Sequence, residues 1–206
     1  MNSMYEKVKR VMDVCLSFVC LVAFTPGFIV IAAIICMETP GSPIYVQKRV
    51  GLNGKTFYMY KFRSMYVNAE RELENLLDQN EMGEGPIFKM KNDPRVTKVG
   101  KVLRRTSIDE LPQLVNILKG DMSFVGPRPL LPNEVDKYTP FEQQRLTVRP
   151  GLTCYWQCSG RNKIGFQKWV ELDIKYIKER CLLTDFKIIL KTFVAVLTMD
   201  WMVQNK

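Results

Sequence analysis

The chain has 206 residues, a formal net charge of +9 and no histidine. This length allows one domain with a hydrophobic core together with a membrane element. The absence of histidine excludes Ser-His-Asp and Cys-His nucleophile systems and any zinc site with a histidine ligand. The positive charge suits nucleic acid, anionic lipid headgroups or phosphorylated substrates, and it does not choose among them.

The six cysteines follow no metal-binding or disulfide pattern. Three of them lie in an apolar N-terminal segment, where cysteine behaves as a small hydrophobic residue. Cys154 and Cys158 are further apart than the pair of a CxxC motif, and Cys181 stands alone. We expect all six to be reduced, which fits a cytosolic protein surface better than a secreted scaffold.

A segment without any charged side chain covers residues 14–37. It exceeds the about 20 apolar residues that cross a bilayer, and no small-residue cleavage site of a signal peptide follows it. One interpretation is a straight transmembrane helix. Thr25 and Pro26 in its middle favour a second one, because an interior proline removes a backbone hydrogen bond and kinks a helix.

Basic residues flank both ends of this segment, with Lys9 before it and Arg49 after it. The positive-inside rule then places both ends in the cytoplasm. A re-entrant helix-break-helix hairpin satisfies both observations, and the Thr25 hydroxyl could bond a carbonyl freed at the break. We therefore interpret residues 1–38 as a re-entrant membrane anchor that starts with an amphipathic helix at headgroup level, and residues 39–206 as a cytosolic domain.

The polar part of the chain begins with a predicted β-hairpin. Two short strands are expected at residues 44–50 and 56–62, joined by a turn at 51–54. Their lysines and arginines alternate with aromatic side chains, a pattern that could suit nucleic acid. We favour a solvated hairpin with an aromatic core face, and we expect no nucleic-acid partner. Residues 67–79 are predicted to form an acidic amphipathic helix whose only role is packing.

Two adjacent carboxylates stand in the motif RRTSIDELPQL at residues 104–114. A short helix is expected just before them at residues 97–105. A second helix is expected to run from Asp109 to about Lys119, with Gly120 as its C-cap.

The local structure at the start of the second helix has two alternatives. Ser107 and Glu110 match the S-x-x-E pattern of a capping box, in which Glu110 only closes the helix end. In the other alternative Asp109 is the N-cap, and Pro112 then occupies the third helical position, where its missing N–H costs little. Either arrangement is compatible with catalysis, since a helix N-terminus favours both a carboxylate anion and a bound phosphate.

Arginines accompany the carboxylates on both sides, with Arg104 and Arg105 before them and Arg128 after them. A carboxylate can attack phosphorus or hold Mg²⁺, while guanidinium groups neutralise phosphoryl oxygens. Pro127 and Pro129 stiffen the backbone around Arg128, which suits a phosphate clamp, although a surface turn would have the same pattern. Together with the apolar segment, this combination indicates an enzyme that acts on phosphate at a membrane surface.

Helical periodicity returns at residues 166–177 and 184–202. The second of these helices is strongly apolar, so it either lies on the bilayer surface or packs into the core. The predicted fold class is α+β, predominantly helical with a small β-hairpin, an N-terminal re-entrant membrane helix-break-helix and amphipathic surface helices.

At this point the motifs carry a family resemblance. The chain resembles the bacterial sugar transferases, the small monotopic phosphoglycosyl transferases that act on a polyprenol phosphate. The likeness extends through nearly the whole sequence. It rests on KRVMD at 9–13, QKRVG at 47–51, YKFRSM at 60–65, SIDELPQL at 107–114, LKGDMSFVGPRP at 118–129, RPGLT at 149–153, WQCSGRN at 156–162 and ELDIKY at 171–176.

The resemblance implies a ping-pong reaction at the bacterial inner membrane, with the catalytic domain on the cytoplasmic face. Asp109 would attack the β-phosphate of a UDP-sugar, release UMP and keep the phosphosugar as a covalent intermediate. Undecaprenyl phosphate would then attack that intermediate. Asp109 and Glu110 would also be ligands of Mg²⁺, and Glu110 could act in acid-base chemistry. The substrate-binding residues implied by motif position are Arg104, Arg128, Arg149, Gln157, Arg161 and Asn162.

The resemblance also bears on the membrane segment and on partners. The family breaks its membrane helix at a Ser-Pro pair, and Thr25-Pro26 keeps the hydroxyl at that place. Membrane lipids are expected partners, and the oligomeric state is open, with a homodimer among the alternatives. Cys154 and Cys158 replace residues that are often glycine and a branched residue in the family, so the donor sugar is not implied. We expect no additional N-terminal membrane domain, so the chain resembles the minimal catalytic form of the family.

Two other functional classes are compatible with the sequence. A membrane-anchored basic module that binds nucleic acid or anionic lipid would account for the charge and the anchor, but it makes no use of the two carboxylates. A scaffold with an inactive catalytic fold would release no UMP from any UDP-sugar.

Overall fold

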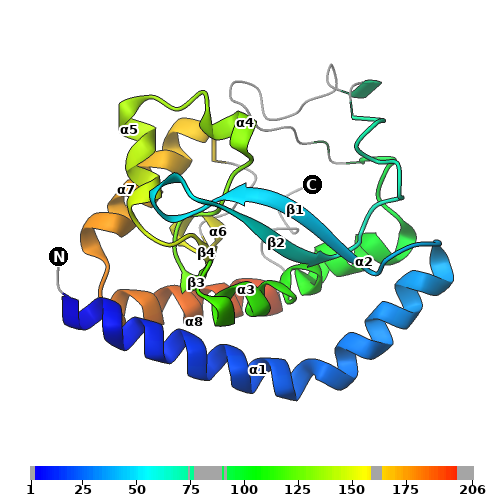
Figure 1. Ribbon diagram of the computed structural model, residues 1–206, viewed down its shortest axis with the longest axis horizontal. Helices are drawn as coiled ribbons and strands as arrows, with labels where there is room; N and C mark the ends of the chain where they lie inside the picture. Colours follow the sequence, from blue (N-terminus) through cyan, green and yellow to red (C-terminus); the bar gives the residue numbers. More distant parts are fainter. Residues whose placement is uncertain (1–2, 74, 77–89, 91, 159–163, 199–206) are drawn as a thin grey trace.

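The computed structural model describes residues 3–73, 75–76, 90, 92–158 and 164–198. The protein is predominantly helical with a small antiparallel β-hairpin, as predicted. One long helix, α1 (Ser3–Glu38), runs along one side of the molecule, and the other described elements lie above it (Figure 1).

Helix α1 differs from the predicted helix-break-helix, because its helical backbone continues through Thr25 and Pro26. The ribbon bends near its middle instead of breaking (Figure 1). The Thr25 hydroxyl donates to the Leu21 carbonyl at 2.7 Å, a bond one helical turn back that is typical of bent helices. A single proline removes only one backbone hydrogen bond, so the helix can curve and still remain continuous. Among the described residues, α1 is the one helix long and apolar enough to cross a membrane.

Both ends of α1 are attached to the same globular body. Near its start, the Arg10 guanidinium donates to the Ile117 and Leu118 carbonyls at 2.6 and 2.8 Å. At its end, the Glu38 carboxylate accepts from the Lys98 backbone N–H at 2.7 Å. Large exposed apolar side chains lie between these attachments, among them Leu16, Phe18, Val19, Val22, Phe24, Ile29, Val30 and Ile34.

The β-hairpin has the predicted bounds, with β1 (Ile44–Val50) antiparallel to β2 (Thr56–Phe62). Its turn contains the 3₁₀ turn η1 (Leu52–Gly54), and Asn53 and Gly54 have positive φ angles of 54° and 76°. The free edge of β2 is bound by the buried side chain of Asn116. Its amide nitrogen donates to the Tyr58 carbonyl at 2.7 Å, and its oxygen accepts from the Tyr60 N–H at 3.0 Å.

The region of the two carboxylates has two helices separated by a turn: α2 (Lys98–Thr106), η3 (Ile108–Glu110) and α3 (Gln113–Lys119). Both predicted capping schemes are wrong. Ser107 has a left-handed φ of 58° and ends α2, and its side chain forms no capping hydrogen bond at the start of η3. Pro112, not Asp109, is the residue before α3. The predicted C-cap is confirmed, because Gly120 has a φ of +94° that favours glycine.

The helix predicted at residues 67–79 is wrong over its described part, and 74 and 77–79 lie outside the described residues. Backbone bonds there join residues three apart, as in successive turns. The Ala69 carbonyl accepts a hydrogen bond from the Arg95 guanidinium at 3.2 Å, and the Tyr66 N–H donates to the Arg95 carbonyl. These bonds to another segment replace those that a regular helix would need.

A second, parallel pair of strands is formed by β3 (Ser123–Val125) and β4 (Gly151–Thr153). Gly126, which follows β3, is in close contact with Gly151 in β4. A Cβ on Gly151 would lie 2.0 Å from the Gly126 nitrogen. The remaining described elements are α4 (Pro132–Val135), α5 (Pro140–Gln143), η4 (Gln144–Thr147), α6 (Tyr155–Cys158), α7 (Phe166–Glu179) and α8 (Leu182–Thr198).

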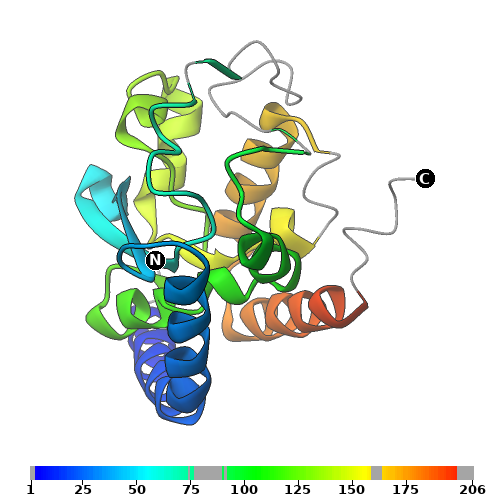
Figure 2. The same ribbon diagram turned by 90° about the vertical axis from the view of Figure 1, so that its right-hand side faces the viewer.

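Helix α8 packs into the core along one face, as one alternative predicted, and leaves an apolar face exposed. Ile188 is fully buried in the core with Tyr176 and Val125. Phe186 and Phe193 belong to an exposed apolar face, whose members are Leu183, Phe186, Leu190, Phe193 and Val194. Figures 1 and 2 show α8 beside α1 on the same side of the molecule. The two helices are joined where Tyr5 and Lys9 contact Asp185 at 2.9 and 2.6 Å.

Candidate active site

The two carboxylates lie in the short turn η3, among cations from other segments. The Glu110 Oε1 atom accepts from Lys61 Nζ at 3.0 Å and from Arg128 Nη2 at 2.7 Å. Lys61 comes from β2, and Arg128 comes from the loop after β3. Asp109, the neighbour of Glu110, is 8% exposed. The fold therefore brings to Glu110 two cations that lie 49 and 18 residues away from it in the sequence.

Asp109 has the most informative electrostatic surroundings. Burial raises its pKa, the negative charge of Glu110 raises it further, and the cations Lys61, Arg104 and Arg128 lower it, with a result of about 6. At neutral pH the carboxylate is therefore largely ionised and yet poorly solvated. An anion in this state is a stronger nucleophile than one surrounded by water.

The cations around the carboxylates are themselves partly buried. Burial lowers the pKa of Lys61, and the charge of Glu110 opposes this effect. Burial also acts against the charge on Arg128, but the ion pair with Glu110 outweighs it and raises the pKa of Arg128. Glu110 thus keeps two cations charged beside Asp109.

Arg104 reaches the same region from the last turn of α2. Its Nε atom donates to the Ser64 hydroxyl at 2.8 Å. Burial lowers the pKa of Arg104, and the charge of Asp109 raises it again. Of the residues predicted from the sequence, the structure therefore brings together Asp109, Glu110, Arg104 and Arg128.

The other predicted substrate-binding residues have different surroundings. Arg149 donates to the Gly120 carbonyl at 3.0 Å, at the end of α3 that Arg10 also contacts. Gln157 is 2% exposed, and its amide nitrogen and oxygen have no hydrogen-bond partner among the described residues. Arg161 and Asn162 lie outside the described residues.

Lys61 is a site residue that the sequence interpretation missed, since it was assigned with its neighbours to a solvated hairpin. Its side chain is 15% exposed and ion-paired. The alternation of side chains along a strand could have identified Lys61, because it lies on the same face of β2 as Phe57 and Met59. A lysine in line with Met59, which is 3% exposed, is directed toward the protein interior.

The two carboxylates fit a magnesium site in which a substrate supplies some of the other ligands. Mg²⁺ usually takes one or two carboxylates together with substrate phosphates and water, and Asp109 and Glu110 provide two adjacent carboxylates. No group of three or more His, Cys, Asp or Glu side chains suited to a metal occurs among the described residues. The described residues therefore do not provide a complete set of protein ligands for a metal ion.

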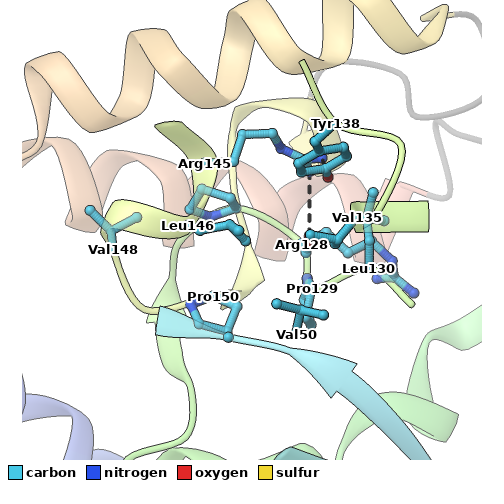
Figure 3. A pocket seen from close by; sticks show the side chains of 12 residues that line it. Val50, Arg128, Pro129, Leu130, Val135, Tyr138, Arg145, Leu146, Val148 and Pro150 are labelled. Carbon is cyan, nitrogen blue, oxygen red and sulfur yellow. Dashed lines mark hydrogen bonds between the residues drawn. The ribbon is translucent and has the colours of Figure 1, made fainter. Parts of the chain in front are cut away.

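A small cavity has Arg128 among the residues that line it. It is lined by Val50, Gly51, Pro127, Arg128, Pro129, Leu130, Val135, Tyr138, Arg145, Leu146, Val148 and Pro150 (Figure 3). Asp109 and Glu110 do not line it. Its mostly apolar lining comes from the places where the hairpin turn, the Pro-Arg-Pro loop and η4 pack together. We therefore assign no substrate to this cavity.

Comparisons with known proteins agree with the character of the site. A family described as bacterial sugar transferase matches residues 4–199. The chain is 49% identical over 173 residues to the galactosyl transferase CpsE of Streptococcus agalactiae serotype III, a match that covers 83% of this chain and 38% of that protein. It is 41% identical over 196 residues to the undecaprenyl-phosphate galactose phosphotransferase of Salmonella typhimurium, covering 94% and 41%.

A further relative is matched over most of its own length. The exopolysaccharide production protein ExoY of Rhizobium meliloti is 41% identical over 191 residues, which are 91% of this chain and 84% of that protein. The chain thus spans about two fifths of the galactosyl transferase and of the galactose phosphotransferase, but more than four fifths of ExoY.

Proposed function

The chain belongs to the bacterial sugar transferase family, and from this premise we propose that it transfers a sugar-1-phosphate from a UDP-sugar to undecaprenyl phosphate and releases UMP. This would be the first membrane step in the synthesis of a polysaccharide or glycoconjugate. The names of its relatives, an undecaprenyl-phosphate galactose phosphotransferase and an exopolysaccharide production protein, support this substrate class.

Asp109 is the nucleophile in the proposed reaction. One of its carboxylate oxygens forms a bond to the β-phosphorus, and the bond from that phosphorus to the oxygen bridging the two phosphates breaks. UMP leaves with the bridging oxygen, and the phosphosugar stays on Asp109 as an acyl phosphate. A phosphate oxygen of undecaprenyl phosphate then attacks the same phosphorus, and the Asp109 carboxylate is restored. The single observation that carries this assignment is the buried Asp109 carboxylate with cations on several sides.

The cations have separate roles in this proposal. Arg128 and Lys61 are held by Glu110 in the free protein, so their positions are fixed before the substrate arrives. Preorganised charges of this kind stabilise negative charge that spreads over phosphoryl oxygens, without reorganising during the reaction. Arg104 approaches from the side of α2 and adds a further positive charge near Asp109.

Mg²⁺ is the cofactor that we propose, held by Asp109 and Glu110. When bound, it would neutralise the diphosphate of the donor and make UMP a better leaving group. The absence of histidine from the chain leaves hard oxygen ligands as the natural choice.

We further propose that residues 1–38 form a re-entrant anchor and that residues 39–206 form the catalytic domain on the cytoplasmic face of the inner membrane. A helix of 36 residues is about 54 Å long, well above the about 30 Å of the hydrocarbon layer. Both of its ends bind the same globular body, through Arg10 and Glu38. A straight span would place those ends on opposite sides of the membrane, away from one of their partners. The exposed face of α8 would lie in the same interface.

The activity is tested by measuring UMP release. Purified protein would be incubated with Mg²⁺, undecaprenyl phosphate and a panel of UDP-sugars, beside the Asp109→Asn variant. We expect release with one or two donors and a loss of at least about a thousandfold in the variant, since the nucleophile is gone. No release with any donor would favour the inactive scaffold, and full activity of the variant would remove Asp109 as nucleophile.

The membrane arrangement is tested by labelling exposed positions before and after the apolar segment of α1. Lys7→Cys and Lys48→Cys, each in a cysteine-free background, would be treated with a membrane-impermeant maleimide. We expect neither to react in intact spheroplasts and both to react in inverted vesicles. Labelling of one of the two in spheroplasts would show a straight span.

A further inference from the structure

The loop that carries Arg128 is held by its carbonyl groups. Two prolines in Gly-Pro-Arg-Pro leave few N–H groups with which this loop could be fixed. Four of its carbonyls, and that of Val125 at the end of β3, accept hydrogen bonds from other segments instead. The pairs are Val125 with the Tyr176 hydroxyl at 3.0 Å, Pro127 with the Gly151 N–H at 3.0 Å, Arg128 with Arg145 Nη2 at 3.3 Å, Pro129 with Arg49 Nη1 at 3.3 Å, and Leu130 with the Val50 N–H at 3.0 Å.

Arg145 is the most deeply buried of the charged groups that hold this loop. The residue is 3% exposed, and its Nε and Nη2 atoms lie 2.9 and 2.7 Å from the Asp173 Oδ2 atom. Its guanidinium lies 5.0 Å from the centre of the Trp169 ring and also donates to the Tyr138 hydroxyl. Figure 3 shows it beside Tyr138, with the chain of Arg128 directly below. A guanidinium confined in this way has one orientation available.

Arg49 holds the neighbouring carbonyl from the hairpin side. Its Nε and Nη2 atoms donate to the Gln47 side-chain oxygen at 3.1 and 2.5 Å, and Nη1 lies 3.8 Å from Glu134. Two arginines from distant segments therefore bind the carbonyls of Arg128 and Pro129. The ion pairs of these two arginines are with Asp173 and Glu134, and the charge of Glu110 also acts on Arg49.

We propose that Arg145, fixed by Asp173, is a positioning residue for Arg128, and that Arg49 supports it from the other side. This inference rests on the proposed function, because it gives Arg145 a part in aligning the cation that meets the donor phosphates. Arg128 has a long side chain with many rotamers, so fixing its backbone restricts the positions that its guanidinium can take. A displacement of about 1 Å at such a group can cost about a hundredfold in rate.

A buried arginine could also serve stability alone, and a double-mutant cycle separates the two roles. Arg145→Lys keeps the charge opposite Asp173 but lacks the fork that also reaches the Arg128 carbonyl. We expect it to lower kcat/KM for the donor about tenfold in the wild-type background and less than twofold in an Arg128→Lys background, because coupled residues are not additive. An equal loss in both backgrounds, or no loss in either, would overturn the proposal.

Arg180→Lys is the matched control. Arg180 also pairs with a carboxylate, Glu6 at 3.1 Å, and donates to a backbone carbonyl, that of Ile177 at 2.7 Å. It should change kcat/KM by the same small factor in both backgrounds. If Arg145→Lys does not fold, Arg49→Lys enters the same cycle, since it removes the bond to the Pro129 carbonyl, and it must show the same coupling.

The outcomes also separate this inference from the proposed function. If the wild-type protein releases UMP and the cycle is additive, the positioning role fails and the transferase stands. If the wild-type protein releases none, the transferase fails, and the cycle is then measured as the affinity for UMP in the presence of Mg²⁺. Coupling of at least about fivefold in that affinity would support the positioning role, and additivity would overturn it.

Discussion

Two buried aspartates in this protein have opposite surroundings. Asp173 is fully buried and has two contacts to Arg145, at 2.9 and 2.7 Å. Asp109 is almost as buried, but the cations near it are bound to other acceptors: Lys61 and Arg128 to Glu110, and Arg104 to Ser64. The charge of Asp173 is therefore paired with a structural partner, although burial still raises its pKa, whereas the charge of Asp109 is balanced by cations that are bound elsewhere.

The largest expected effect concerns the paired aspartate. Asp173→Asn leaves the Arg145 guanidinium buried without its counter-ion, which typically costs about 3–5 kcal/mol of stability. Chemical denaturation of the detergent-solubilised protein should show this loss at neutral pH. A change below about 1 kcal/mol would mean that the pair contributes little, and the contrast between the two aspartates would then be lost.

The unpaired aspartate is expected to behave in the opposite way. Its folded-state pKa of about 6 lies above the ordinary value of 3.8, so ionising it in the folded protein costs free energy. The stability linked to this group is fully present below about pH 3.8 and is lost as the pH rises through about 6. Above pH 6 the cost is on the order of 3 kcal/mol, since one pKa unit corresponds to about 1.4 kcal/mol.

Asp109→Asn removes this cost and should stabilise the protein. In EDTA-containing buffer at pH 7–8, its free energy of unfolding should exceed that of the wild type, and the difference should shrink toward pH 4. A variant that is less stable than wild type at pH 8 would show that the Asp109 charge is well paired in the folded state. The comparison with Asp173→Asn provides the control, because both variants replace a buried carboxylate by its amide.

A smaller effect is expected from one of the distant cations. Lys61→Met removes a charge that lowers the pKa of Asp109, so that pKa should rise and the acidic limb of the kcat/KM profile should move to higher pH. We expect a loss of about ten- to a hundredfold at pH 7, which corresponds to the about 1.5–3 kcal/mol of a charged hydrogen bond.

Lys9→Met is the matched control for Lys61→Met. Lys9 forms a similarly buried ion pair with Asp185 at 2.6 Å. This pair joins α1 to α8 and does not include the carboxylates of η3. It should leave the pH profile unchanged and alter kcat/KM less than about threefold. Equal effects of the two variants would mean that any buried ion pair of this size matters as much as the one at the site.

Local patterns in the sequence predicted the elements that depend on local chemistry. The hairpin has the expected strands, because alternation and turn residues act over a few positions. Gly120 ends α3 as expected for a residue with positive φ. The capping of the carboxylate region was not predictable in the same way, because Ser107 adopts a left-handed conformation and the chain inserts a 3₁₀ turn between two helices.

The site was predictable in its residues but only partly in its contacts. Motif position pointed to Asp109, Glu110, Arg104 and Arg128, and the fold brings these together. Lys61 escaped because its partner lies 49 residues away, and spacing along the chain holds no information on such pairs. The role of Arg145 depends in the same way on a contact to a backbone carbonyl, which no side-chain pattern reveals.

The central claim, a covalent phosphosugar on Asp109, is tested most directly by trapping that intermediate. The protein would be mixed with a UDP-sugar labelled at the β-phosphate, without undecaprenyl phosphate, and precipitated after short times. We predict up to one label per chain, a matching burst of UMP, loss of the label when undecaprenyl phosphate is added, and no label on Asp109→Asn. Rapid transfer in the complete reaction without any labelled protein would contradict the claim and show direct transfer between the two substrates.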